Sequence, residues 1–172
     1  MLEKARLEEE TKNAINWIKE YIDKTNAKGV VVGNSGGKDS GAVIAMATKA
    51  LGKEKVLAVS MPCNSINADF EDAKLVAEIF GVRFIKVDLS STYKELENSL
   101  NYELKEINVD AISKESSINI KPRLRMTTLY GIAQTLRIFS YRHRKSLRSN
   151  GPDILQNGEI VVLTLIRLVI LQ

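Results

Sequence analysis

Cysteine, histidine and tryptophan each occur once among the 172 residues, and proline occurs three times. One cysteine, Cys63, excludes an internal disulfide framework and favours a reducing compartment. The single histidine, His143, has no second metal-binding side chain nearby, so a histidine-based metal site is not expected.

Long uncharged apolar runs are also missing. Residues 2–20 carry charges throughout, which argues against an apolar signal segment there, and no uncharged run reaches the ~20 residues that a membrane span needs. The apolar fraction of 44% is enough for a sizeable core in one domain. We therefore expect a soluble, cytoplasmic protein without a membrane partner.

The formal net charge of +4 would suit a nucleic-acid partner, but the distribution of charge argues against one. Residues 137–172 contain six of the 25 basic and two of the 21 acidic side chains, which leaves nineteen of each sign in residues 1–136. The balanced first part offers no basic stripe for a phosphate backbone. We therefore expect no nucleic-acid partner.

One stretch organises the rest of the sequence: Val30-Val31-Val32-Gly33-Asn34-Ser35-Gly36-Gly37-Lys38-Asp39-Ser40. A β-branched run, small residues and then an apolar run over 41–47 predict a buried strand, a tight loop and a helix N-terminus. Because glycine has no Cβ, the main-chain N–H groups of the loop are free to approach an oxyanion, and the positive end of the helix dipole points to the same place. Asp39 is unusual in an anion site unless it binds a divalent cation that bridges to phosphates. The stretch therefore predicts a phosphate site that contains a metal ligand.

The spacing of this loop excludes two common nucleotide motifs. It is neither the Walker pattern nor the Gly-x-Gly-x-x-Gly pattern of dinucleotide sites. Residues 35–40 instead resemble the pyrophosphatase loop of enzymes that split ATP between its α and β phosphates. A glycine turn without a ligand is the alternative, and the order Ser-Gly-Gly-x-Asp-Ser directly after a valine-rich strand argues against it.

The rest of the first 136 residues alternates between predicted helices and short apolar strands. We expect helices over 2–26, 38–50, 68–80 and 91–104, and strands over 30–33, 56–61 and 84–89. Repeated β-α units with short connections predict an α/β protein with a doubly wound parallel sheet and helices on both faces. Ligands of such sheets bind beyond the carboxyl ends of the strands, so the loops at 33–40, 60–65 and 88–92 should share one cleft. The first helix has an apolar stripe made of Leu7, Ala14, Ile15, Trp17, Ile18, Tyr21 and Ile22.

A second motif follows a polar stretch, 108–117, for which we expect mobility. Asn119-Ile120-Lys121-Pro122-Arg123-Leu124-Arg125-Met126 leads into a predicted helix that ends near Leu136, and Pro122 suits its first turn. Two solvated surface arginines are the simpler interpretation of Arg123 and Arg125. A fork that binds phosphate or carboxylate is the functional one.

Residues 35–40, the Met61-Pro62 strand end and residues 119–130 closely resemble the ammonia-dependent NAD synthetases. These enzymes belong to the pyrophosphatase-loop superfamily, with an adenine nucleotide alpha-hydrolase-like, Rossmann-like fold. The loop motif is common to that superfamily, including GMP synthetase and tRNA-lysidine synthetase. The Arg-x-Arg-Met helix start after Asn-x-Lys narrows the resemblance to NAD synthetase, over roughly residues 1–136.

The resemblance implies amidation of nicotinic acid adenine dinucleotide (deamido-NAD). ATP would adenylate the substrate carboxylate, pyrophosphate would leave, and ammonia would attack to give NAD and AMP, without a side-chain nucleophile. Asp39 would bind Mg²⁺ and Arg123 would contact deamido-NAD. Family members are homodimers, and the stripe over 14–22 could contribute to the interface. The residues implied in ATP binding are Gly33, Asn34, Ser35, Gly36, Gly37, Lys38, Asp39, Ser40, Ser60 and Met61, and among these Asn34 departs from the apolar residue usual before the serine.

The resemblance stops after Leu136, and we treat residues 137–172 as a separate tail. Residues 141–145 are basic and 160–171 are apolar and β-branched, so a solvated linker followed by one apolar strand is the literal interpretation. A nucleic-acid-binding tail is the functional alternative.

A third hypothesis is that the tail is translated out of frame. Residues 138–151, back-translated with permitted codons and read one base later, can give a family-like segment containing Gly-Thr-Gly. Codons from 152 onward, read two bases later, permit Gly-Tyr-Phe-Thr-Lys-Trp-Gly-Asp. Two single-base insertions would suffice. The α/β domain would then be truncated and incomplete at its C-terminus, and turnover would be low or absent.

Two other classes of function stay open. One is a different adenylating enzyme of the superfamily, GMP synthetase-like or tRNA-modifying, although the neutral first part argues against an RNA substrate. The other is a non-catalytic nucleotide-binding fragment, or a module that binds nucleic acid through 137–150.

Overall fold

The protein was analysed as a computed structural model that describes residues 2–25, 27–64 and 67–136, so the predictions for the tail lie outside it. Its centre is a parallel sheet of three strands in the order β1 (Val30–Gly33), β2 (Val56–Ser60) and β3 (Arg83–Lys86). In the register, Val30 pairs with Val56 and Leu57 pairs with Arg83. The three expected strands are confirmed, with two differences in their bounds. The second ends at Ser60 rather than at residue 61, and the third spans Arg83–Lys86 rather than 84–89.

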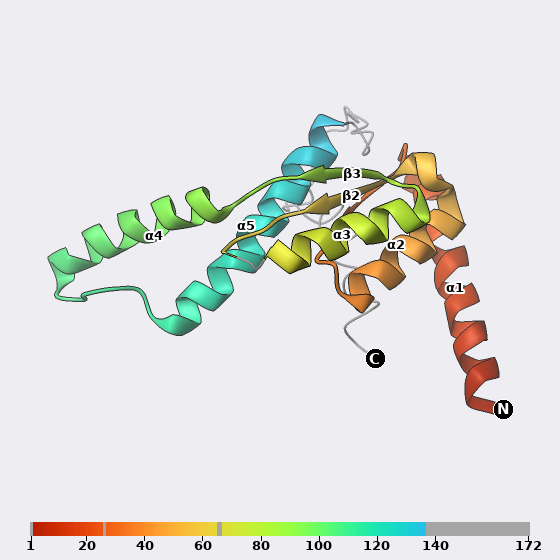
Figure 1. Ribbon diagram of the computed structural model, residues 1–172, viewed down its shortest axis with the longest axis horizontal. Coiled ribbons are helices and arrows are strands. Elements are labelled where there is room, and N and C mark those ends of the chain that lie inside the picture. The colour runs from red at the N-terminus through yellow and green to blue at the C-terminus, as the bar shows by residue number, and fades with distance from the viewer. Residues whose placement is uncertain (1, 26, 65–66, 137–172) are drawn as a thin grey trace, which may run out of the picture.

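Helices cover both faces of this sheet (Figure 1). On one face, α2 (Lys38–Leu51) and the short η1 (Lys53–Lys55) connect β1 to β2, and α3 (Asn67–Phe80) connects β2 to β3. The long helix α1 (Leu2–Thr25) packs against α2. After β3, α4 (Ser90–Leu104) and η2 (Lys105–Ile107) lead to α5 (Lys114–Thr135), which returns to pack on β1 from the other face. The predicted fold class, a parallel α/β sheet with helices on both faces, is confirmed.

The strands alternate their side chains between two separate cores, as a sheet buried on both faces requires. Val30 and Val32 pack with α1, α2 and α3, whereas Val31 packs with α4 and α5. The same alternation holds in β2, all five residues of which are buried. The uninterrupted valine run of β1 reflects this burial, because every side chain of the strand points into one of the two cores.

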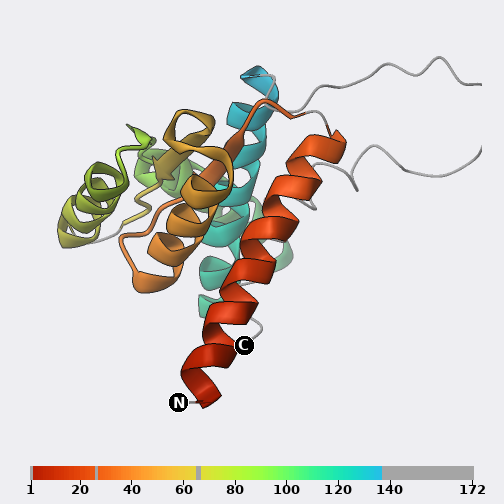
Figure 2. The same ribbon diagram turned by 90° about the vertical axis from the view of Figure 1, so that its right-hand side faces the viewer.

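The apolar stripe of α1 is only partly a core stripe. Ile18 and Ile22 are buried, and Trp17 stacks on Tyr21 with ring centroids 5.3 Å apart beside them. Leu7 is 55% exposed, so its placement in the core stripe was wrong. The N-terminal half of α1 projects beyond the other helices and strands that the structure describes (Figure 2).

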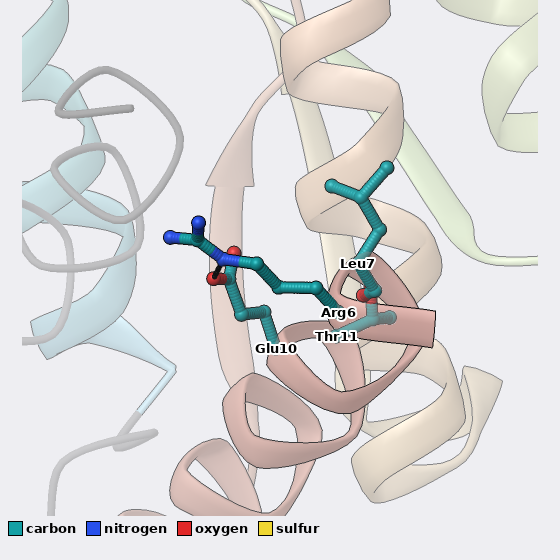
Figure 3. A network of polar contacts seen from close by, with 4 residues as sticks. All are labelled: Arg6, Leu7, Glu10 and Thr11. Atoms are coloured by element: carbon teal, nitrogen blue, oxygen red, sulfur yellow. Dashed lines mark hydrogen bonds and ion pairs between the residues drawn. The ribbon is translucent and has the colours of Figure 1, made fainter. Parts of the chain in front are cut away.

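Local bonds stabilise this projecting half of the helix instead (Figure 3). Arg6 Nε donates to Glu10 Oε1 at 2.9 Å, and Thr11 Oγ1 donates to the main-chain oxygen of Leu7 at 2.7 Å. An exposed i,i+4 ion pair such as Arg6–Glu10 contributes about 0.2–0.5 kcal/mol, whereas the bond from a threonine hydroxyl back to its own helix satisfies the hydroxyl without adding comparable stability.

The start of α5 also differs from the prediction. The helix begins at Lys114, so Pro122 lies in its interior and the predicted mobile stretch contributes its last residues to the first turn. Ser113 is the N-cap, and its side chain accepts a hydrogen bond from the N–H of Ser116 at 3.2 Å. The cap lies nine positions before Pro122, so the helix begins more than two turns before the proline. Pro122 has no N–H and cannot donate a main-chain hydrogen bond within the helix.

No helix in the part of the chain that the structure describes is long and apolar enough to cross a membrane.

Candidate functional site

The carboxyl ends of the three strands lie side by side at one edge of the sheet. The N–H of Asn34 donates to the oxygen of Val59 at 2.8 Å, which extends the pairing of β1 and β2 by one residue. On the other side of β2, the N–H of Val87 donates to the oxygen of Ser60 at 2.9 Å, and the N–H of Leu89 donates to the oxygen of Pro62 at 2.8 Å. The loops that follow the three strands therefore begin at one edge of the sheet, and the shared cleft expected there stays a prediction.

The loop that follows β1 is closed by hydroxyl groups. Ser40 Oγ accepts from the N–H of Ser35 at 3.3 Å and donates to the oxygen of Gly37 at 2.9 Å. Ser35 Oγ accepts from the N–H of Gly37 at 3.3 Å and lies 3.2 Å from Ser40 Oγ. The contacts that the N–H groups of Ser35 and Gly37 make are solvent-exposed, so these main-chain donors lie at the surface of the loop.

Gly36 occupies the tightest point of the loop. Its φ of 80° lies in the left-handed region, and a Cβ built there would come within 2.7 Å of the main-chain oxygen of Asp69 and 2.8 Å of the Cβ of Asp72. Only glycine combines this backbone angle with this close approach to α3. Gly36 is thus required by the path of the chain as well as by access for an anion.

The helix after the loop presents a positive end without a side-chain cap. Gly37 is the N-cap of α2 with extended backbone angles, and it makes no side-chain cap hydrogen bond. The first-turn N–H groups of a helix lack intrahelical partners, so this end is suited to a negatively charged ligand. Lys38 and Asp39 are exposed in the same turn.

Asp39 is the one acidic residue in that first turn. Among the residues that the structure describes, no group of three or more His, Cys, Asp or Glu side chains could hold a metal ion. A single exposed carboxylate beside a phosphate site still fits Mg²⁺, which keeps several waters and takes further oxygens from substrate phosphates. Asp39 is therefore chemically compatible with magnesium bound together with a nucleotide.

The end of β2 is buried and is held by the second motif. Ser60 is 5% exposed and Met61 is 7% exposed. Arg125, in α5, donates from Nε to the main-chain oxygen of Met61 at 3.0 Å. Met61 also covers Gly33, where a built Cβ would lie 3.3 Å from the methionine Cε. The sequence analysis paired Arg125 with Arg123 and did not place Arg125 at the site. The Arg-x-Arg spacing could have indicated its separate role, because residues two positions apart lie on different faces of a helix.

Arg123 is exposed and remains on its own helix. Its Nη1 donates to the main-chain oxygen of Asn119 at 2.9 Å and lies 3.4 Å from Asn119 Oδ1. The guanidinium is thus accessible for a ligand. Of the two arginines of the motif, the structure brings Arg125 to the strand edge as a structural contact and leaves Arg123 at the surface.

Two titratable groups lie beyond β3 and β2 at the same edge. The N–H of Ser90 donates to Asp88 Oδ1 at 2.9 Å. This bond, together with one from the Ser90 hydroxyl, stabilises the carboxylate and lowers the pKa of Asp88 below its usual range. Burial raises the pKa of the Cys63 thiol, although the nearby cations of Arg125 and Lys121 oppose the shift. Cys63 is therefore a neutral, buried thiol at neutral pH, with the properties of a core residue rather than of a nucleophile.

These features define a Rossmann-like α/β protein whose strand-loop-helix unit is typical of nucleotide phosphate binding. The NAD synthase family model matches residues 10–140. The chain belongs to the NAD synthase family. The predicted resemblance to ammonia-dependent NAD synthetases is thereby confirmed.

Two curated relatives illustrate the match. The chain is 42% identical over 129 residues to the NH(3)-dependent NAD(+) synthetase of Carboxydothermus hydrogenoformans, covering 75% of this chain and 51% of the relative. It is 42% identical over 118 residues to the enzyme of the same name from Finegoldia magna, covering 69% and 45%. The chain thus spans about half the length of the curated relatives that it matches.

Solved structures give the same fold. The NH3-dependent NAD synthetase from Campylobacter jejuni, in complex with the nitrate ion, superposes with a TM-score of 0.63 at 26% identity, covering 74% of this chain and 52% of that chain. The glutamine-dependent NAD+ synthetase from Acinetobacter baumannii, in complex with ADP, superposes with a TM-score of 0.67 at 27% identity, covering 74% and 23%.

Proposed function

We propose that this chain binds ATP and deamido-NAD and supports the amidation reaction of the ammonia-dependent NAD synthetases. The observation that carries the proposal is that the two motifs meet at one edge of the sheet. Arg125 of α5 bonds to the main-chain oxygen of Met61, and the Met61 side chain lies against Gly33 at the start of the loop. Membership of the NAD synthase family supports the assignment of substrates.

In the proposed reaction, the carboxylate of deamido-NAD attacks the α-phosphorus of ATP and pyrophosphate leaves. Ammonia then attacks the acyl adenylate to give the amide of NAD, and AMP leaves. The loop N–H groups and the uncapped first turn of α2 bind the phosphates and stabilise the charge that develops on the leaving pyrophosphate. Ammonia is the nucleophile, so no side chain of this chain has to form a covalent intermediate.

Asp39 would hold Mg²⁺. The ion supplies charge neutralisation of the leaving pyrophosphate when bound. The role of Asp39 itself is to place a carboxylate oxygen beside the phosphates, and Lys38, exposed in the same turn, would bind the phosphates.

The residues proposed to bind adenine and deamido-NAD belong to the end of β2 and to α5. Ser60 and Met61 end the strand against which adenine would lie, and Arg123, exposed on α5, would contact deamido-NAD. We further propose a homodimer to which the α1 stripe at 14–22 contributes, and a cytoplasmic location. The single buried thiol, Cys63, is consistent with the latter.

The test of the function is binding by the 172-residue chain. Isothermal titration with ATP, with and without Mg²⁺, is expected to show magnesium-dependent binding, followed by binding of deamido-NAD to the ATP-loaded chain. Arg123→Ala should weaken the second step about tenfold, as loss of a charge-assisted hydrogen bond predicts, without changing the first. Binding of GMP precursors or tRNA in place of deamido-NAD would favour the other adenylating enzymes. ATP binding alone would favour a non-catalytic fragment.

The tail is the subject of a separate proposal. We propose that residues 137–172 are read out of frame, because codons permitted by residues 138–151 and 152 onward encode family-like segments in the correct order when shifted. The family-model match, which ends at residue 140, is compatible with this division near Leu136. Sequencing the locus over codons 130–172 tests the proposal. A locus whose actual codons give no family-like segment in either shifted frame would overturn it.

A further inference from the structure

Asn34 is the residue of the loop that departs from the family pattern, and it is 2% exposed. Its Nδ2 donates to the main-chain oxygen of Ala73 in α3 at 2.7 Å. Its Oδ1 accepts from the N–H of Gly36 at 3.1 Å, and its own N–H continues the sheet by bonding to Val59. One side chain thus ties the end of β1, the turn of the loop and α3 together.

The carboxamide fits in one orientation only. Exchanging its oxygen and nitrogen would place an NH₂ group against the N–H of Gly36 and a carbonyl against the oxygen of Ala73, and both contacts would be repulsive. An apolar side chain could fill the space, but it would leave the N–H of Gly36 and the second lone pair of Ala73 without this partner. The position of Gly36 against α3 is therefore fixed by polar complementarity as well as by packing.

We propose that Asn34 is a positioning residue that holds the loop in its phosphate-binding conformation and removes the N–H of Gly36 from the donors offered to phosphate. The proposal rests on the proposed ATP-binding function. The three loop donors differ in their acceptors: Gly36 bonds to the amide oxygen of the buried Asn34, whereas Ser35 and Gly37 bond to serine hydroxyls in solvent-exposed contacts. One of these hydroxyls, Ser40 Oγ, also lies 2.9 Å from the oxygen of Gly37 and 3.5 Å from Asn34 Oδ1. A change of one side-chain torsion moves a serine Oγ away from the N–H that it accepts from, while the Asn34 amide is fixed by its bond to the oxygen of Ala73. ATP accordingly binds the N–H groups of Ser35 and Gly37.

Amide exchange of the ¹⁵N-labelled 172-residue chain tests the donor assignment directly. Without nucleotide, the amide of Gly36 is expected to exchange at least about tenfold more slowly than that of Gly37, because its acceptor is buried and fixed. Addition of ATP and Mg²⁺ should slow exchange at Ser35 and Gly37 and leave Gly36 unchanged. A fast Gly36 amide in the free chain, or ATP protection confined to Gly36, would overturn the proposal.

Asn34→Leu tests the positioning role. This variant restores an apolar residue, and it is expected to fold, lose the protection of Gly36 and bind ATP with Mg²⁺ about tenfold more weakly. Asn101→Leu is the matched control: Asn101 Oδ1 accepts from the N–H of Ile112 at 2.8 Å, in the α4–α5 connection away from the loop, so ATP affinity should stay unchanged.

The outcomes separate this inference from the function on which it rests. If the wild-type chain does not bind ATP, the proposed function fails, and the Gly36 exchange rate still decides whether the Asn34 bond holds the loop. If wild type binds ATP and a folded Asn34→Leu variant binds it equally well, the positioning role is wrong. If Asn34→Leu fails to fold, the exchange pattern of the wild-type chain with and without ATP decides.

Discussion

Arg125 donates from Nε to the main-chain oxygen of Met61 at 3.0 Å, although the two residues are 64 positions apart in the chain. The bond joins α5 to the end of the central strand β2. Because the Met61 side chain in turn covers Gly33, the second motif reaches the start of the phosphate loop through a single intermediate residue. The two motifs of the sequence, residues 33–40 and 119–130, are therefore parts of one site edge.

This relationship predicts a specific loss in Arg125→Lys. A lysine ammonium has no Nε–H at that point of the chain, so the Met61 oxygen loses its donor in a partly buried position. The free energy of unfolding in urea should fall by about 1 kcal/mol, and ATP should bind more weakly. Arg83→Lys, at an exposed arginine of β3, should change stability by less than about 0.5 kcal/mol. Equal effects of the two substitutions would show that the Met61 contact contributes nothing.

Gly36→Ala should damage both the fold and the loop. Its φ of 80° and the 2.7 Å approach of a Cβ to Asp69 force the loop to move, which we expect to lower the free energy of unfolding by about 2 kcal/mol or more. Gly131→Ala is the opposite case, because it lies inside α5 with nothing within 4 Å of a built Cβ. That variant should gain up to about 1 kcal/mol of stability. Urea unfolding of both variants is the measurement.

Asp39→Asn should remove the magnesium dependence of ATP binding. The amide keeps the size of the side chain but loses the charge that Mg²⁺ requires, so titrations with and without Mg²⁺ should give the same affinity. The circular dichroism spectrum and thermal midpoint should match wild type, since Asp39 is exposed. Asp110→Asn, an exposed acid in the loop before α5, is expected to retain the dependence. Retained dependence in Asp39→Asn would place the ion elsewhere.

The Cys63 thiol predicts a pH dependence of stability. Its pKa is raised by burial, so the folded state binds the thiol proton more tightly than the unfolded state does. The stabilising contribution is complete below the pKa of the unfolded thiol and is lost as the pH rises through the higher pKa of the folded one. The difference in free energy of unfolding between wild type and Cys63→Ala should therefore shrink from pH 7 toward alkaline pH. A difference that grows over that range would mean that Arg125 and Lys121, not burial, dominate.

Turnover by the 172-residue chain should be low or absent. If the tail is out of frame, the chain lacks the family's C-terminal site residues, while the loop for ATP remains. A coupled assay with ATP, Mg²⁺, ammonia and deamido-NAD should detect little NAD under conditions in which ATP binds. Restoring the frame in the gene should raise the rate. Clear amide formation by the chain as it stands would contradict this expectation.

The sequence by itself determined the elements of the central sheet and the identity of the loop. The valine run, the glycine pair and the following apolar run each favour one local conformation, so β1, the loop and α2 lie within about one residue of their predicted bounds. The start of α5 escaped prediction because a proline is locally a first-turn residue, whereas the cap at Ser113 and packing at Leu129 hold the longer helix. Leu7 was wrongly assigned to the core because the apolar periodicity of a helix does not show how far along the helix the elements packed against it extend.

Only the tertiary structure decided the roles of Asn34 and Arg125. In the sequence, Asn34 is a deviation from a pattern and Arg125 one of two adjacent arginines. Asn34 bonds to Ala73, 39 positions away, and Arg125 bonds to Met61, 64 positions away. Segments so distant in the chain meet at one edge only when the helical crossover connections between the parallel strands have formed. Local preference selects which residues form strand, turn and helix. A hydrogen bond between distant residues depends on the packing of whole elements, and no local pattern specifies it.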